Sequence, residues 1–177
     1  MQNYWNSLQD AIAVTSSRDL GSEEFARLPS PILNQEHCKA LIDVMTQELG
    51  FGHLTPADIG LQCAGVNWKM KSKFEQIIQN KVLLTLGSIK VAGDPIFEME
   101  TLDLLKLRAS GRYHVWWSLQ SGEIVDITFA TSMLIKQGGD LSKAVPLAGF
   151  PEQFPKVEWI PKLVGDKAIH QLLSFGW

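Results

Sequence analysis

YHVWWSLQSGEIVDITF, residues 113–129, consists of two arms rich in aromatic and β-branched residues around a short polar centre. Arms of this kind are typical of β-strands. The polar centre suits a three-residue hairpin loop, because glycine at its last position tolerates the left-handed backbone that such a loop requires. We therefore predict an antiparallel hairpin with Gln120, Ser121 and Gly122 as its loop.

The loop length determines which side chains share a face of the sheet. With three loop residues, Trp116 lies opposite Asp126 and His114 lies opposite Thr128. His114 and Asp126 are then diagonal neighbours on one face, whereas a two- or four-residue loop would place them on opposite faces. A carboxylate beside an imidazole fixes the tautomer of the ring and supports its charged form.

The chain before the hairpin is mainly helical. Apolar residues at helical spacing predict helices over about 4–14, 35–49 and 64–80, and Thr55-Pro56 suits the start of a short helix. Residues 82–93 are typical of a strand with a bulge or bend at Gly87, ended by Asp94-Pro95, and residues 98–108 suit a helix or a strand equally.

The segment from residue 145 is rich in proline, so we expect loops that wrap the domain and end in a helix near 166–174. Helices followed by strands favour an α+β fold, with helices packed on an antiparallel sheet. A length of 177 residues favours one domain, with a core at about 55–130 and a wrapping tail at 145–177.

Composition excludes several classes of function. The 16 basic and 19 acidic residues give a net charge of -3 without any block of like charges, which argues against a nucleic-acid or anionic-membrane surface. The N-terminus lacks the pattern of a signal peptide, and no window approaches the roughly 20 apolar residues of a membrane span. We therefore expect a cytoplasmic protein with reduced thiols.

Two cysteines and four scattered histidines fit no close-spaced zinc pattern, so we expect neither a metal nor another cofactor.

Cys63 lies at the predicted start of the helix over 64–80. The partial positive charge and free N–H groups of a helix N-terminus stabilise a thiolate and can hold a developing oxyanion. Cys63 also lies in helical register with Asn67 and Phe74, so a buried thiol that extends the apolar stripe is the alternative. Cys38 lies within an apolar helix face and is expected to be an inert core thiol.

The order of these motifs resembles a known group of enzymes. QCAGVNW at 62–68, HVW at 114–116 and GEIVDIT at 122–128 are similar to the transglutaminase-like and arylamine N-acetyltransferase-like branch of the papain-like thiol enzymes. The resemblance covers about 55–130 and implies a papain-like or transglutaminase-like core. It also implies Cys63 as the nucleophile, His114 as the base and Asp126 as the acid that orients the base.

The chain differs from the family pattern at two positions. The aromatic residue that usually follows the nucleophile directly comes five residues later, at Trp68, and Ala57 occupies the position of a papain-type oxyanion glutamine. Gln62 is the polar residue adjacent to the nucleophile. Gln62, Trp68 and Trp116 are therefore the candidate substrate-binding residues.

These observations favour a hydrolase or acyltransferase with a Cys-His-Asp triad, acting on an amide, isopeptide or thioester of a peptide or small acyl substrate. Two alternatives stay open. The first is a non-catalytic binding module on a papain-like fold, and the second is a structural or assembly protein that uses an aromatic surface. The sequence fixes neither the oligomeric state nor the choice between hydrolysis and transfer.

Overall fold

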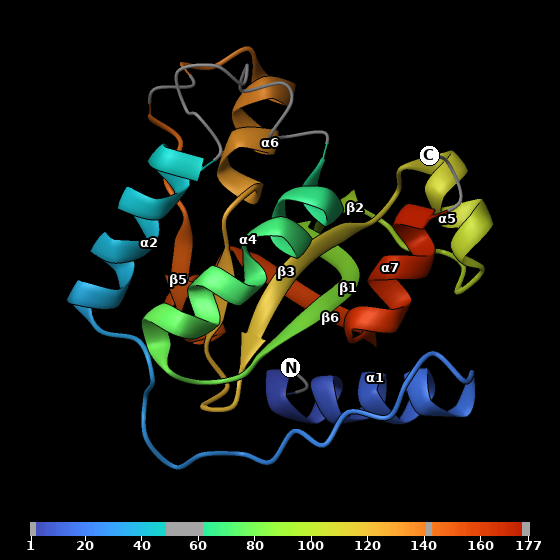
Figure 1. Cartoon of the computed structure of the whole chain (residues 1–177). Coiled ribbons are helices and arrows are strands. Elements are labelled where there is room, and N and C mark those ends of the chain that lie inside the picture. The colour runs from blue at the N-terminus through green and yellow to red at the C-terminus, as the bar shows by residue number, and fades with distance from the viewer. Residues whose placement is uncertain (1–2, 49–61, 141–142, 175–177) are drawn as a thin grey trace.

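The computed structural model describes residues 3–48, 62–140 and 143–174. Its helices are α1 (Tyr4–Ser17), α2 (Gln35–Glu48), α4 (Cys63–Ile78), α5 (Leu104–Ser110), α6 (Phe129–Gln137) and α7 (Asp166–Ser174), with a 3-10 turn, η2, at Pro151–Gln153. Its strands are β1 (Val82–Val91), β2 (Asp94–Phe97), β3 (His114–Leu119), β4 (Ile124–Asp126), β5 (Leu147–Gly149) and β6 (Val157–Val164). The predicted α+β class, with helices on an antiparallel sheet, is confirmed (Figure 1).

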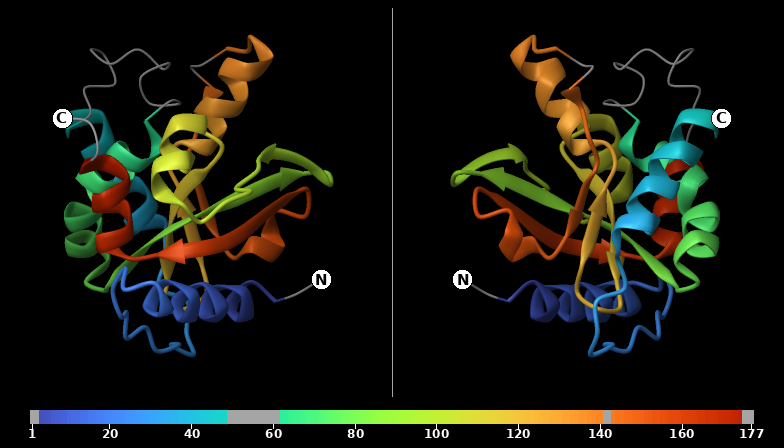
Figure 2. Two further views of the ribbon diagram at one scale, coloured as in Figure 1. Left: turned by 90° about the vertical axis from the view of Figure 1, so that its right-hand side faces the viewer. Right: turned by 90° about the vertical axis from the view of Figure 1, so that its left-hand side faces the viewer.

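The long strand β1 organises the sheet, and all of its pairings are antiparallel. One edge of β1 pairs with β3 along residues 82–87 and with β2 along residues 89–91, and the other edge pairs with β6. The sheet continues from β3 through β4 to β5. Figure 2 shows β1 and β6 running side by side, with β3 and β4 crossing toward the end where α6 lies.

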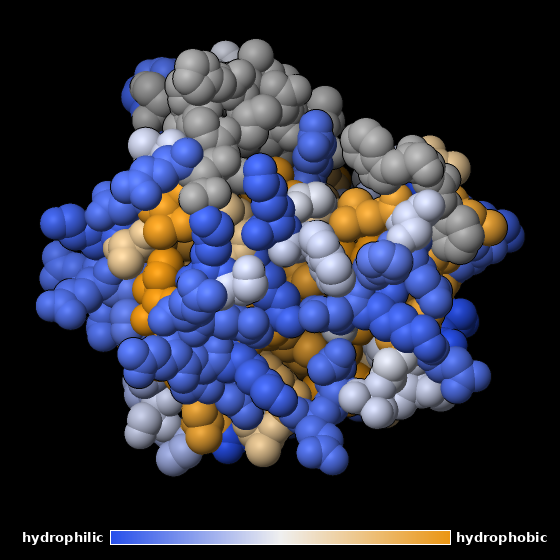
Figure 3. Space-filling model, viewed as in Figure 1, coloured by the Kyte–Doolittle hydropathy of each residue, from blue (hydrophilic) through white to orange (hydrophobic). Residues whose placement is uncertain are grey.

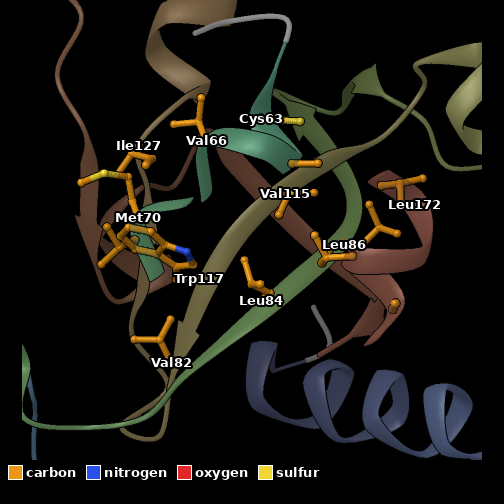
Figure 4. Packing of buried hydrophobic residues seen from close by; sticks show 14 of the residues in the cluster. Cys63, Val66, Met70, Val82, Leu84, Leu86, Val115, Trp117, Ile127 and Leu172 are labelled. Atoms are coloured by element: carbon orange, nitrogen blue, oxygen red, sulfur yellow. The ribbon is translucent and has the colours of Figure 1, made fainter. Parts of the chain in front are cut away.

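Alternate residues of the strands enter two hydrophobic clusters, one on each face of the sheet. Leu84 and Trp117 belong to the cluster beneath α4 and α7, and Figure 4 shows them packed with Met70 of α4. Leu83 and Trp116 belong to the other cluster, which α1 covers. Helix α4 therefore lies against the face opposite α1, and its first residues reach the end of the sheet where β3 begins.

The central hairpin has the predicted register. Trp117 pairs with Val125 and Ser118 pairs with Ile124, as a three-residue loop requires. Gly122 has a φ of 91°, in the region that favours glycine, and its N–H donates to the Leu119 carbonyl over 2.9 Å.

The predicted helices and strands before the hairpin lie within about three residues of their observed bounds, as the ranges above show. The ambiguous segment 98–108 contains the helix α5, because Asp103 caps its start and Gly111 ends it with a φ of 62°. The bulge expected at Gly87 is confirmed as a register shift between β1 and β6. The short helix predicted at Thr55-Pro56 lies outside the described residues.

Two expectations about proline were wrong. The segment after residue 145 is not a set of loops, because it contains β5 and the eight-residue strand β6. Pro161 is tolerated there since β6 is an edge strand and Pro161 faces Gly87 at the bulge. Asp94-Pro95 begins β2 after a turn at Ala92 and Gly93, rather than simply ending a strand.

None of the helices in the described ranges combines the length and the apolar character needed to cross a bilayer.

Candidate functional site

Three elements bring Cys63, His114 and Asp126 to one end of the sheet. Cys63 is the first residue of α4, His114 is the first residue of β3, and Asp126 is the last residue of β4. Figure 4 shows Cys63 at the start of α4, at the end of the sheet where Val115 of β3 lies. The side chains of His114 and Asp126 have no exposed surface, and Cys63 is 7% exposed.

His114 and Asp126 form a buried pair, on one face of the hairpin as predicted. The Nε2 atom of His114 lies 2.9 Å from each carboxylate oxygen of Asp126. The carboxylate also accepts hydrogen bonds from Trp159 Nε1 over 3.0 Å and from the backbone N–H of Phe129 over 3.0 Å. Because Phe129 begins α6, Asp126 also lies where a helix N-terminus favours negative charge. Three different elements therefore fix the position of the Asp126 carboxylate.

Aromatic rings enclose the imidazole of His114. The rings of Phe97, Phe129 and Trp116 lie 4.8, 6.0 and 6.4 Å from it, centroid to centroid. Burial alone would lower the pKa of His114, but the charge of Asp126, the hydrogen bond to it and the contact with Cys63 raise the pKa from 6.5 to about 10. The ring is therefore a cation at neutral pH, held by a carboxylate on one side.

The second ring nitrogen of His114, Nδ1, is not bound by Asp126. Nδ1 is buried and makes no well-aligned hydrogen bond with any described residue, although interaction with Cys63 is among the causes that raise the pKa of His114. We interpret this as a contact without good hydrogen-bond alignment. Catalytic hydrogen bonds are often loose in unliganded enzymes and tighten when substrate binds.

The start of α4 leaves backbone donors beside the thiol. The first N–H groups of a helix have no acceptor within the helix. Gln62 precedes Cys63 at the cap position, but its side chain forms no capping hydrogen bond and is exposed to solvent. Among the described residues, the cap side chain therefore does not occupy the N–H groups of the first turn, which lie beside the thiol and suit a negatively charged oxygen.

The three candidate substrate-binding residues differ in exposure and in their contacts. Gln62 is exposed next to Cys63. Trp68 is half-buried against the cluster beneath α4, and its ring lies 6.0 Å from that of His170 on α7. Trp116 is fully buried and donates from Nε1 to the hydroxyl of Tyr4 over 2.7 Å. Its contacts give Trp116 a packing role beneath His114 and do not themselves support contact with a substrate.

Cys38 lies apart from this group. It is half-buried on α2, and burial followed by the negative charge of Glu123 raises its pKa. On the side of β3 near Cys63, burial raises the pKa of Tyr113 to about 12, with a further contribution from the charge of Cys63 and an opposing one from Arg108. The two cysteines therefore differ in their charged neighbours: Cys38 is influenced by Glu123, whereas Cys63 interacts with His114.

Sequence reasoning missed three residues of this site. Phe97 covers the ring of His114, Trp159 donates to Asp126, and Asn67 donates to backbone carbonyls near the thiol. Asn67 carried a signal, since it is a polar residue within an otherwise apolar helix stripe. Trp159 carried none, because its strand was taken for a loop.

A hollow of about 210 Å³ is lined by residues of β1, β2 and β6 and by the segment 98–100. Its lining includes Phe97, whose ring contacts His114, and the charged residues Lys90, Glu98 and Lys162. Among the described residues, no group of three or more His, Cys, Asp or Glu side chains is arranged to hold a metal ion.

In comparisons with known proteins, the chain matches no family model, no curated protein and no solved structure. The interpretation of the site therefore depends on its own geometry and chemistry.

Proposed function

We propose that the chain is a cysteine-nucleophile enzyme, a hydrolase or acyltransferase acting on an amide, isopeptide or thioester of a peptide or small acyl substrate. One observation carries the proposal. His114 and Asp126 form a fully buried pair, Nδ1 of His114 has no hydrogen-bond partner among the described residues, and the thiol of Cys63 at the N-terminus of α4 is among the groups that raise the pKa of His114. This is the arrangement that nucleophilic thiol chemistry requires.

Each residue of the triad has a step in this chemistry. The Sγ of Cys63, as a thiolate, attacks the carbonyl carbon, and the N–H groups at the start of α4 hold the resulting oxyanion. The bond to the amine or thiol leaving group then breaks, and protonated His114 supplies a proton to that group from Nδ1. The acyl group remains on Cys63 as a thioester. Water or an amine attacks it while His114 takes up a proton, which releases the carboxylic acid or the new amide.

Asp126 has a supporting part in every step. Its carboxylate binds Nε2 of His114 and so directs Nδ1 toward Cys63. Its charge stabilises the imidazolium that accompanies a thiolate. The hydrogen bonds from Trp159 and from the start of α6 hold the carboxylate of Asp126 in this position.

The proposed relation is to the papain-like thiol enzymes of the transglutaminase-like and arylamine N-acetyltransferase-like branch. It is supported by a cysteine that starts a helix and by histidine and aspartate in two adjacent antiparallel strands. A cytoplasmic location, where Cys38 and Cys63 would both stay reduced, completes the proposal.

The assembly-protein alternative gains no support from the described surface. The large hydrophobic residues most exposed there are Leu28, Ile42, Leu105 and Val145, none of which is aromatic. Polar residues predominate on the face in Figure 3, and apolar residues show between them in separate areas.

Trapping of the acyl intermediate tests the proposal. The protein is incubated with p-nitrophenyl acetate or with a simple acyl thioester, and the acylated peptide is identified by mass spectrometry. We expect acetyl groups on Cys63 and none on Cys38, loss of labelling in Cys63→Ala and His114→Gln, and unchanged labelling in the matched variant Cys38→Ala. Folded protein without acylation at Cys63 would contradict the enzymatic function and favour the binding module.

A further inference from the structure

We infer that Asn67 is a positioning residue that holds the thiol of Cys63 in register with the imidazole of His114. The inference rests on the proposed function, because it assigns a role within that same site. It concerns the side-chain amide of Asn67, which lies inside α4 one turn after Cys63 and has no exposed surface.

The amide of Asn67 joins the two halves of the site. Its Nδ2 group donates one hydrogen bond to the carbonyl of Cys63 over 2.8 Å and another to the carbonyl of Val115 over 3.0 Å. Cys63 carries the thiol, and Val115 directly follows His114 in β3. Both hydrogens of one –NH₂ group are therefore used to connect the backbone of the nucleophile with the backbone beside the base.

A second bond fixes Asn67 itself. The indole Nε1 of Trp117, on β3, donates to the backbone carbonyl of Asn67 over 3.2 Å. The side chain and the backbone of Asn67 are thus both bonded to β3.

A purely structural reason for an asparagine at this position is weak. Its neighbours on the helix stripe, Met70 and Phe74, are apolar and fully buried. The Oδ1 atom of Asn67 is buried as well and has no hydrogen-bond partner among the described residues. An unpaired buried acceptor destabilises a fold, and leucine, which has a similar volume, would avoid that cost but would remove the donor to the carbonyls of Cys63 and Val115. Compared with leucine, asparagine at position 67 contributes the two hydrogen bonds from Nδ2 to the carbonyls of Cys63 and Val115.

Helix α4 has a second attachment to the sheet that does not involve Asn67. The ring of Phe74 stacks on that of Trp117 at 4.7 Å, two turns further from the thiol. Loss of the Asn67 amide should therefore leave α4 docked but release its first turn. Small displacements of a nucleophile from its base reduce reactivity steeply.

The test compares Asn67→Leu with the parent, using the alkylation rate of each cysteine by iodoacetamide between pH 5 and 9. We expect the rate at Cys63 near pH 6 to fall at least about tenfold, and its pH profile to become that of an ordinary thiol. The rate at Cys38, measured in the same molecule, should stay within about twofold. Asn67→Asp should behave like Asn67→Leu, because a carboxylate cannot donate to the two carbonyls.

Met70→Ala is the matched control. It removes a fully buried side chain from the same stripe of α4 without touching the two carbonyls. Its melting temperature should fall, while the pH profile of Cys63 should stay that of the parent. Should Asn67→Leu not fold, Asn67→Ser supplies the same measurement, because a serine hydroxyl reaches the carbonyl of Cys63 but not also that of Val115.

The outcomes separate this inference from the proposed function. Parent-like Cys63 reactivity in folded Asn67→Leu or Asn67→Ser, or equal losses in Met70→Ala, would overturn the positioning role and leave the triad intact. A parent protein in which Cys63 reacts no faster than Cys38 would instead overturn the proposed function.

Discussion

The Nε2 atom of His114 lies 2.9 Å from both carboxylate oxygens of Asp126, across a hairpin whose loop has three residues. Neither side chain is exposed to solvent. A buried pair of this kind contributes little net stability, because desolvation offsets much of the attraction between the charges. We therefore interpret the His114–Asp126 pair as a functional feature that keeps a charged imidazole near a thiol, and not as a contact that stabilises the fold.

Asp126→Asn should weaken both the site and the fold. The amide keeps the shape of the carboxylate but loses its charge, and its –NH₂ group would face donors such as Trp159 Nε1. We expect the pKa of His114 to fall, Cys63 to alkylate more slowly at low pH, and the free energy of unfolding to drop by about 3–5 kcal/mol.

Asp103→Asn is the matched control for that change. Asp103 caps the start of α5 and is exposed, and asparagine caps helices as well as aspartate does. Urea denaturation and peptide-resolved alkylation should both be unchanged in this variant. Equal effects of the two substitutions, or an Asp126→Asn protein with parental Cys63 reactivity at every pH, would contradict the assignment.

Stability should fall as the pH rises above neutrality. The pKa of His114 is raised from 6.5 to about 10, so the folded protein retains a proton that the unfolded chain releases in this interval. The stabilisation is complete below pH 6.5 and is lost as the pH rises toward 10, by up to about 1.4 kcal/mol per pH unit. Urea denaturation at several pH values measures this slope. His114→Gln should lack it, and an identical slope in both proteins would refute the raised pKa.

Trp159 and Asp126 should be energetically coupled. The hydrogen bond from the indole Nε1 to the carboxylate is charge-assisted, and such bonds contribute about 1.5–3 kcal/mol. In a double-mutant cycle of Trp159→Phe and Asp126→Asn, followed by urea denaturation, we expect a coupling of at least about 1 kcal/mol. Losses that add within about 0.3 kcal/mol would mean that this bond does not support the carboxylate.

Gly87 should be intolerant of any side chain. A Cβ atom there would overlap the carbonyl oxygen of Ile160 on β6, and Gly87 pairs with His114 on the other edge. We expect Gly87→Ala to lower the free energy of unfolding by about 1–3 kcal/mol. Gly65→Ala, within α4 and free of neighbours at that position, should instead raise it by about 0.5–1 kcal/mol. If Gly87→Ala is as stable in urea as the parent, β1 and β6 can move apart at this position with little loss of free energy, and the prediction is wrong.

Local patterns were sufficient to predict the hairpin and the contact between His114 and Asp126. The loop of the hairpin is encoded by Gly122, and the loop length alone places His114 and Asp126 on one face. The start of α4 at Cys63 likewise followed from the apolar spacing of that helix. These features depend only on residues that are close in the sequence, so the sequence pattern is enough to predict them.

Non-local pairing could not be predicted in the same way. Strand β6 is stabilised by β1, about 70 residues earlier in the chain, and Pro161 made it look like a loop. The contact of Trp159 with Asp126 depends on that pairing, and so it was hidden too. The bonds of Asn67 to Cys63 and Val115 depend on how α4 docks on β3, which no spacing within α4 reveals.

The most direct measurement is the rate at which iodoacetamide alkylates each cysteine of the folded protein near pH 6, resolved by mass spectrometry of the Cys38 and Cys63 peptides. The start of α4 and the imidazole of His114 place positive charge near the thiol of Cys63, whereas burial and then the charge of Glu123 raise the pKa of Cys38. We expect Cys63 to react at least about tenfold faster than Cys38 and His114→Gln to abolish the difference. Equal rates, or faster labelling of Cys38, would contradict the assignment of Cys63 as the nucleophile.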